Sequence, residues 1–260
     1  MEMEDTMSLT IDLSGKTALV TGASRGIGKA IALALGAAGA RVAVHGFSNA
    51  ASAEEVARLA GNESEPFIAD LSAEDAPDVL FDRVLQRFGR LDVLVNNAGV
   101  ALEMPISLSR EDWGERWRKT MNVNARASEW LARRAVQHFR EHGGGRMVHI
   151  ASRAAFRGDT QDYITYAASK GAIVAMSRSV ARAFGKDNIC SFVIAPGWVR
   201  TDMATGHLDR AGEAAVVEEL ALPRLTEPED IAPMVVLLAS GLADHATGTS
   251  IDINAASYVR

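Results

Sequence analysis

The chain has only one cysteine among its 260 residues, which excludes an internal disulfide. Basic residues are outnumbered by acidic ones, with 27 Lys and Arg against 33 Asp and Glu, and the formal net charge is −6. Nucleic acids and anionic membranes are bound by basic surfaces, so we expect neither as a partner. No apolar run reaches the roughly 18 residues of a membrane-spanning helix. The stretch rich in Ala and Leu that begins at Ile31 is interrupted by Gly36, Gly39 and Arg41.

The single cysteine, Cys190, lies in the apolar run Ile189–Ile194, so we interpret it as a buried strand thiol and not as a nucleophile. Residues Met1–Asp12 are acidic and lack a continuous apolar stretch, the reverse of a secretory leader. We therefore expect a frayed tail over residues 1–12, with Met7 as an alternative start, and a cytoplasmic protein.

Short runs rich in valine and isoleucine alternate with longer helical segments along the whole chain. The predicted strands are Thr17–Thr21, Arg41–His45, Pro66–Ala69, Leu91–Asn96, Arg146–Ala151, Asn188–Ala195 and Thr249–Ile253. The predicted helices are Gly26–Ala38, Ala51–Ala60, Ala73–Phe88, Arg110–His142, Thr165–Phe184 and Glu227–Ser240. Apolar residues at successive strand positions indicate parallel strands buried on both faces. This alternation predicts an α/β fold, a doubly wound seven-stranded parallel sheet of the Rossmann type. We find no repeat and no composition break, so residues 13–260 are predicted to form a single domain.

The segment over residues 201–222 follows the sixth predicted strand and has helical character at Glu213–Leu220. Gly206 and Gly212 are candidate hinges. Because this segment would overhang the carboxyl end of the sheet, where open α/β sheets bind ligands, we interpret it as a substrate lid.

A glycine-rich turn, Thr21–Gly28, joins the first predicted strand to the first predicted helix. Its glycines allow the backbone to approach a ligand closely, and the helix that follows offers unpaired N–H groups to a phosphate. The position of the turn at the start of a strand–helix–strand series favours a dinucleotide site. Its spacing, Gly-x-x-x-Gly-x-Gly, differs from the more common Gly-x-Gly-x-x-Gly fingerprint.

Tyr166 and Lys170 are four residues apart, which places their side chains on one helix face. A free phenol has a pKa of about 10 and is a poor proton shuttle at neutral pH. A neighbouring ammonium favours the phenolate, so the sequence predicts a lowered pKa for Tyr166 and a role as general acid or base.

These motifs resemble the short-chain dehydrogenase/reductase family, in its simple single-domain branch, over about Leu13 to Ile253. In the motif regions the resemblance is closest to 3-oxoacyl-acyl-carrier-protein reductases. The motifs occur in the order typical of the family, which is the glycine turn, Asn96-Asn97-Ala98-Gly99, Asn124, Ser152, Tyr166 with Lys170, and Pro196-Gly197.

The resemblance implies four catalytic residues. Tyr166 would be the acid/base, and Lys170 would hold the nicotinamide ribose and lower the pKa of the tyrosine. Ser152 would bind the reacting oxygen. Asn124 would kink its helix and support a proton relay, with Asn122 as a competing candidate. The neighbouring Tyr163 has Ala167 four residues after it, so we expect it to shape the substrate pocket. That pocket is predicted to include Ala154, Phe156, Tyr163, Trp198 and the lid over Met203–Leu220.

The resemblance also implies the cofactor contacts, which are Gly22, Ser24, Arg25, Ile27, Asp70, Leu71, Asn97, Ala98, Gly99, Pro196, Gly197, Val199 and Thr201, together with Tyr166 and Lys170. An acidic residue at the end of the second strand would select NAD, but the run Val44–Asn49 contains none. Because the guanidinium of Arg25 is placed to pair with a 2′-phosphate, we expect NADP(H) in preference to NAD(H).

Three departures from the family pattern are visible. Ser152 lies fourteen residues before Tyr166, one more than is common, and Tyr163 is an additional tyrosine. Near the C-terminus, where the family usually has a glycine pair, this chain has Ile253-Asn254-Ala255-Ala256 instead. Apolar positions on the two longest helices, by analogy with the family, predict a homodimer or homotetramer.

The run His138–His142 has the His-x-x-Glu-His order of some zinc peptidases. Because Gly143 follows it, we interpret both histidines as belonging to a final helical turn and predict no metal site. The sequence thus predicts an NADP(H)-dependent oxidoreductase acting on a carbonyl or secondary alcohol of unknown identity. The alternative is a non-catalytic nicotinamide-binding regulatory protein on the same fold.

Overall fold

The structure, a computed structural model of the chain, describes residues 10–205 and 212–260. Its centre is a seven-stranded sheet in which every neighbouring pair is parallel, in the order β3-β2-β1-β4-β5-β6-β7. The strands are β1 (Thr17–Val20), β2 (Arg41–Gly46), β3 (Glu65–Ile68), β4 (Val93–Asn96), β5 (Gly145–Ile150), β6 (Ile189–Pro196) and β7 (Ser250–Ile253). All residues of β1, β4 and β6 are buried, as their apolar runs predicted. The predicted fold is confirmed.

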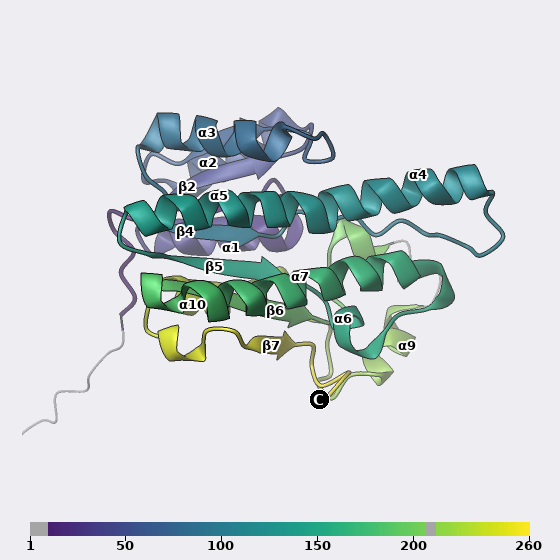
Figure 1. Cartoon of the computed structure of the whole chain (residues 1–260). Coiled ribbons are helices and arrows are strands. Elements are labelled where there is room, and N and C mark those ends of the chain that lie inside the picture. Colours follow the sequence, from purple (N-terminus) through teal and green to yellow (C-terminus); the bar gives the residue numbers. More distant parts are fainter. Residues whose placement is uncertain (1–9, 206–211) are drawn as a thin grey trace, which may run out of the picture.

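Helices cover both faces of the sheet, with α5 and α7 in front and α1 and α10 behind in Figure 1. One apolar core packs α1, α2 and α10 against the sheet, and a second packs α3 and α5. The helices are α1 (Gly26–Ala37), α2 (Ala50–Ala60), α3 (Ala76–Phe88), α4 (Arg110–Met121), α5 (Ala127–Glu141), α6 (Ala154–Arg157), α7 (Ile164–Phe184), α9 (Glu213–Glu218) and α10 (Pro228–Ala239). Within the described ranges, no helix is long and apolar enough to cross a membrane.

The helix predicted over residues 110–142 is interrupted. A π-helical turn, η1 (Asn122–Arg126), joins α4 to α5 and contains Asn124, the residue predicted to kink this helix. Such turns widen a helix locally and are frequent at functional sites. Here the turn brings a buried amide side chain to the carboxyl end of the sheet.

The strands direct their carboxyl ends toward one side of the molecule, where α4, α6 and α9 project beyond the sheet (Figure 1). Parts of the predicted lid, Thr201–Thr205 and α9, lie on this side, whereas residues 206–211 of the lid lie outside the described residues, as do residues 1–9 of the predicted tail. The lid and the tail therefore stay predictions.

Ala255 and Ala256, in the run that departs from the family's glycine pair, both have left-handed backbone conformations, with φ of +50° and +53°. The carbonyl oxygen of Ala255 accepts a hydrogen bond of 2.8 Å from the backbone N–H of Ala221, so neighbouring chain holds this conformation. A Cβ in this region costs about 1–2 kcal/mol. We expect Ala255→Gly and Ala256→Gly each to raise the free energy of unfolding by about 1 kcal/mol, measured by urea denaturation.

The matched control for these variants is Ala51→Gly, at an exposed position inside α2. There the same substitution should lower the free energy of unfolding by up to about 1 kcal/mol. If the variants at 255 and 256 were destabilised as Ala51→Gly is, the strain assigned to these two residues would be wrong.

Candidate active site

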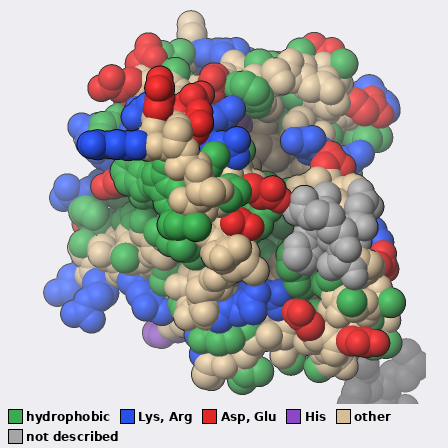
Figure 2. Space-filling model, turned by 90° about the vertical axis from the view of Figure 1, so that its right-hand side faces the viewer, with side chains coloured by type: hydrophobic (Ala, Val, Ile, Leu, Met, Phe, Trp, Pro, Cys, Tyr) green, Lys and Arg blue, Asp and Glu red, His purple; other side chains and the backbone are tan. Residues whose placement is uncertain are grey.

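A cavity of about 390 Å³ opens at the carboxyl end of the sheet, between the glycine turn and α7. Figure 2 looks onto this end of the molecule, where Lys and Arg side chains lie beside Asp and Glu side chains. All the residues predicted to contact a cofactor line this cavity. They are Gly22, Ser24, Arg25, Ile27, Asp70, Leu71, Asn97, Ala98, Gly99, Tyr166, Lys170, Pro196, Gly197, Val199 and Thr201.

The glycine turn closes tightly over the start of α1. Gly22 and Gly26 have φ of +64° and +54°, and a Cβ at Gly28 would overlap the carbonyl oxygen of Gly22. The side chain of Arg25, the N-cap residue, makes no capping hydrogen bond, and the first turn of α1 contains no acidic residue. The N–H groups at this helix end are therefore available to an anion, which fits the pyrophosphate of a dinucleotide.

His45, at the end of β2, holds the glycine turn in place. Its Nδ1 accepts a hydrogen bond of 3.0 Å from the N–H of Gly22, and its Nε2 lies 3.1 Å from the carbonyl oxygen of Ala69. Burial lowers the pKa of His45 to about 4, so the ring is neutral near pH 7 and its Nε2–H donates to Ala69. The sequence analysis missed this residue, whose only signal was its place at the end of the second predicted strand.

Asn97 and Thr21 fasten the ends of β4 and β1 to each other. The Asn97 Nδ2 donates to the carbonyl oxygens of Thr21 and Gly22, at 2.7 and 3.1 Å. The Thr21 Oγ1 in turn accepts from the N–H groups of Asn97 and Ala98, at 2.9 and 3.0 Å. These bonds fix the cavity floor at the point where the strand order reverses, which is the usual ligand site of this topology.

The residues that follow β2 include no carboxylate at the cavity. Phe47 lines the cavity and is 61% exposed. The guanidinium of Arg25 does not stand free for a phosphate, because its Nη1 lies 2.9 Å from Oδ2 of Asp202. Both side chains are largely exposed, and pairs of this kind contribute only about 0–1 kcal/mol.

Tyr166 and Lys170 both reach the cavity from α7, and Ser152 reaches it from the end of β5. The Lys170 Nζ lies 5.7 Å from the centre of the Tyr166 ring and donates to the carbonyl oxygen of Ile150 at 2.9 Å. Ser152 hydrogen-bonds the Tyr166 phenol. The three side chains therefore line the same cavity, with Tyr166 beside both of the others.

The pKa of Tyr166 is raised in the structure, whereas the sequence predicted that it would be lowered. Desolvation of the phenol raises its pKa to about 12, and the hydrogen bond with Ser152 opposes this only in part. Burial lowers the pKa of Lys170 to about 8. The spacing of Tyr166 and Lys170 in the sequence indicates the charge of the neighbouring amine but not the loss of water around both groups, which here has the larger effect on the pKa.

Asn124 is fully buried behind the cavity wall. Its Oδ1 accepts from the N–H of Val100 at 2.8 Å, and its Nδ2 donates to the carbonyl oxygen of Val100 and to Oγ of Ser169, at 2.9 and 3.0 Å. It thus joins the loop after β4 to α7 beside Lys170. The competing residue Asn122 instead has its Nδ2 3.5 Å from the carbonyl oxygen of Ser72, away from this group.

The predicted substrate pocket is only partly the observed one. Tyr163, Trp198 and Met203 line the cavity, whereas Ala154 and Phe156 do not. The Phe156 ring instead lies under the guanidinium of Arg260, at 3.7 Å. Lining residues that the sequence analysis did not identify include Phe47, Val100, Lys119, Arg153, Arg157 and Asp159.

The two histidines of the His-x-x-Glu-His motif stack on each other at 3.9 Å. The His138 Nε2 accepts from the N–H of Leu91, and His142 Nδ1 bonds the carbonyl oxygen of His138. Within residues 10–205 and 212–260 no cluster of metal-ligating side chains is found. Cys190 is buried in β6, as predicted.

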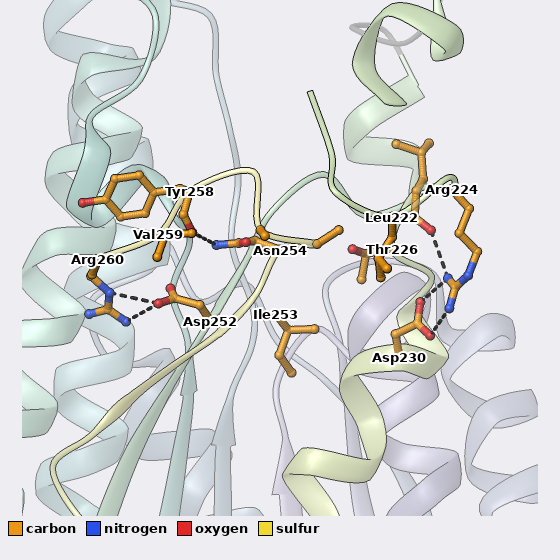
Figure 3. A pocket seen from close by; sticks show the side chains of 13 residues that line it. Leu222, Arg224, Thr226, Asp230, Asp252, Ile253, Asn254, Tyr258, Val259 and Arg260 are labelled. Atoms are coloured by element: carbon orange, nitrogen blue, oxygen red, sulfur yellow. Dashed lines mark hydrogen bonds and ion pairs between the residues drawn. The ribbon is translucent and has the colours of Figure 1, made fainter. Parts of the chain in front are cut away.

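A second cavity, of about 450 Å³, lies between β7, the C-terminal residues and the start of α10 (Figure 3). Its charged residues are already paired, Arg224 with Asp230 and Arg260 with Asp252. The Asn254 Nδ2 donates to the carbonyl oxygen of Tyr258. This cavity contains none of the predicted catalytic residues.

Trp117 on α4 and Trp130 on α5 are 46% and 37% exposed. Both residues lie within the helix predicted over residues 110–142, which, together with the helix now seen as α7, is predicted from the family resemblance to pack against a second copy of the chain. The homodimer or homotetramer stays a prediction.

Comparison with known proteins gives one consistent result. A family model described as enoyl-(acyl carrier protein) reductase matches residues 22–255. The 3-oxoacyl-acyl-carrier-protein reductase of Pseudomonas aeruginosa is 32% identical over 96% of this chain and 100% of its own length. The 2-dehydro-3-deoxy-D-gluconate 5-dehydrogenase of Escherichia coli is 32% identical over 93% and 95% of the two chains. A candidate NAD(P)-dependent gluconate 5-dehydrogenase of Beutenbergia cavernae, with NADP bound at low occupancy, superposes with a TM-score of 0.87 at 33% identity, over 95% of this chain and 98% of its own.

Proposed function

The chain belongs to the short-chain dehydrogenase/reductase family and is an oxidoreductase of CH–OH and C=O groups, and on this premise we propose that it uses NADP(H) with Tyr166 as general acid and base. The observation that supports the proposal best is one cavity that joins the glycine turn to Tyr166, Ser152 and Lys170. When bound, the nicotinamide supplies or accepts the hydride.

The residues present fit a dinucleotide along the whole cavity. The start of α1 would hold the pyrophosphate, and Asp70 and Leu71 would lie at the adenine. Lys170 would bind the nicotinamide ribose. The remaining lining residues would form the floor and the nicotinamide end, and they are Asn97, Ala98, Gly99, Pro196, Gly197, Val199 and Thr201.

The proton chemistry follows from the two hydroxyl groups. A phenol whose pKa is about 12 carries its proton at neutral pH, which suits the donor that carbonyl reduction requires. Ser152 would hold the substrate oxygen beside it and stabilise the charge that develops there. The Lys170 ammonium would favour the phenolate left after proton transfer, and Asn124 would keep α7 and the loop after β4 in register.

For the cofactor, we propose a preference for NADP(H). A 2′-phosphate carries up to two charges and would displace Asp202 from Arg25, because their exposed pair is weak. We expect Arg25→Ala to lower the ratio of kcat/KM for NADPH over NADH by about tenfold, as one charge-assisted bond to phosphate is lost. Asp202→Asn, the matched control, should keep or raise this ratio. Equal use of both cofactors by the unchanged protein would contradict the assignment.

The test of the function itself is NADPH oxidation with a panel of carbonyl compounds. The named relatives act on acyl thioesters and on sugar acids, so the panel should contain 3-oxoacyl thioesters and keto-gluconates together with neutral ketones. NADPH binding without turnover of any compound would instead support the non-catalytic alternative.

A further inference from the structure

Arg153 is a buried cation in the wall of the cavity. It follows Ser152 directly, and its backbone N–H donates to the carbonyl oxygen of Pro196 at 2.9 Å. Its side chain is only 5% exposed, yet it lines the same cavity as Tyr166. Buried charges in proteins are normally paired, because the loss of hydration is otherwise uncompensated.

The guanidinium has no adequate partner in the described part of the chain. Both Nη1 and Nη2 are buried and make no hydrogen bond there. The nearest carboxylate is that of Glu219, just after α9, at 3.9 Å from Nη2, which is outside hydrogen-bond range. The guanidinium carbon lies 5.5 Å from the centre of the Trp198 ring, which gives it an aromatic wall and no acceptor oxygen.

The other charged groups near Arg153 do not satisfy its hydrogen-bond donors. Burial lowers its pKa, and Arg157 at the end of α6 acts in the same direction, whereas Glu219 and Asp159 act against it. Arg157 and Asp159 are both exposed, and their opposite charges compensate each other. What remains at the cavity is a buried guanidinium with two unused donors, whose formal charge is matched, among the described residues, only by the exposed carboxylate of Glu219 at 3.9 Å.

We propose that Arg153 binds a carboxylate of the substrate, so that the substrate class is an oxo acid and its product the corresponding hydroxy acid. The inference rests on the proposed function. A guanidinium presents two parallel N–H groups that match a planar carboxylate, and their desolvated position strengthens the pairing. A single guanidinium balances a carboxylate better than a dianionic phosphate.

The position of Arg153 also limits the substrate. Because Arg153 is adjacent in sequence to Ser152, which would hold the reacting oxygen, the carboxylate would be separated from the carbonyl by only a few carbon atoms. Trp198, whose ring faces the guanidinium and which also lines the cavity, would cover the chain between the two groups.

The competing explanation is structural, since Arg153 would then serve only to anchor α9 through Glu219. The two explanations differ in what removal of Glu219 does. If Arg153 only anchors α9, Glu219→Gln should change kcat/KM for the oxo acids as much as an Arg153 variant does. If Arg153 binds the substrate, Glu219→Gln should change kcat/KM for the oxo acids by less than about threefold. The reason is that Glu219 is an exposed residue that makes no hydrogen bond to Arg153.

The experiment compares oxo acids, with one to four carbons between carbonyl and carboxylate, with the primary amides of the same acids. With NADPH, the unchanged protein should reduce its best oxo acid with a kcat/KM about 100 times that for the corresponding amide. The amide lacks the carboxylate and would leave the buried N–H donors of the site unpaired. Arg153→Gln should bring this ratio close to one, and Arg153→Lys should restore part of it. Glu219→Gln should keep it.

A second readout is independent of turnover. Malonate, which is not a carbonyl substrate, should raise the melting temperature of the NADPH-bound protein by a few degrees, and this shift should be absent in Arg153→Gln. Malonate binding that survives in Arg153→Gln, or an acid-to-amide ratio near one in the unchanged protein, would overturn the inference. Reduction of neutral ketones alone would refute it and leave the proposed function intact, whereas a lack of turnover with every carbonyl would refute the proposed function.

Discussion

Tyr166→Phe is expected to lower kcat by roughly 10³-fold and to change the dissociation constant for NADPH by less than about threefold. Removal of a general acid typically costs between 10² and 10⁴ in rate. The phenol is the group whose raised pKa, about 12, keeps its proton available near pH 7. The ring itself, which helps to form the cavity wall, is retained in phenylalanine. Steady-state NADPH oxidation and NADPH fluorescence titration measure the two quantities.

The control for this variant is Tyr163→Phe. Tyr163 lines the same cavity, but its hydroxyl donates to Oε1 of Glu103 at 3.1 Å, and no lysine follows it at helical spacing. We expect its kcat to remain within about fivefold of the unchanged protein. If Tyr166→Phe retained more than a tenth of the original kcat, the proton would have another source and the assignment of the acid/base would be wrong.

The fold was predictable because its signals are local. Apolar runs such as the one in β6 identify strands buried on both faces, and the glycines of the turn over Thr21–Gly28 identify a close approach of backbone to ligand. The same locality explains why every predicted cofactor residue lines the cavity. Residues that follow parallel strands meet at one edge of the sheet, whatever the details of packing.

The electrostatics of the site were not predictable in this way, because they depend on pairs distant in sequence. Arg25 meets Asp202 across 177 positions, and His45 meets Gly22 and Ala69 only once β1, β2 and β3 are side by side. The guanidinium of Arg153 meets the ring of Trp198, in the segment after β6, at 5.5 Å. Solvent exposure is likewise a property of the fold, so the Tyr166 pKa could not be judged from its spacing to Lys170.

The left-handed alanines show a related limit. The sequence revealed that Ala255-Ala256 departs from the family's glycine pair but gave no indication that the backbone would keep the glycine-like conformation. The structure shows that it does, with Ala221 bonded to the carbonyl oxygen of Ala255. Neighbouring contacts thus fixed the backbone more strongly than the local preference of alanine.

Lys170→Met is expected to weaken catalysis while stabilising the protein without cofactor. Burial lowers the pKa of Lys170 from 10.5 to about 8, so the folded state bears a cost for its ammonium at every pH below about 8. Between pH 8 and 10.5 the unfolded chain binds more protons than the folded one, and the free energy of unfolding therefore rises with pH. The pKa shift corresponds to a cost of at most about 3 kcal/mol, which the variant removes. The variant also loses the hydrogen bond to the carbonyl oxygen of Ile150, which lowers the free energy of unfolding by about 1 kcal/mol. We expect a net gain of about 2 kcal/mol at pH 7, measured by urea denaturation.

The catalytic loss in Lys170→Met should have its own pH signature. In the unchanged protein the dissociation constant for NADPH should increase as the pH rises through about 8, because Lys170 then loses the charge that binds the ribose and favours the phenolate. In Lys170→Met this dependence should be absent, and kcat/KM should be about 10²-fold lower at pH 7. Lys186→Met, which removes an exposed amine, should change neither quantity. If Lys170→Met were less stable and its NADPH dissociation constant still depended on pH, Lys170 would serve packing alone. If the variant is more stable and has a lower kcat/KM, burial of this amine costs stability and the cavity needs its charge.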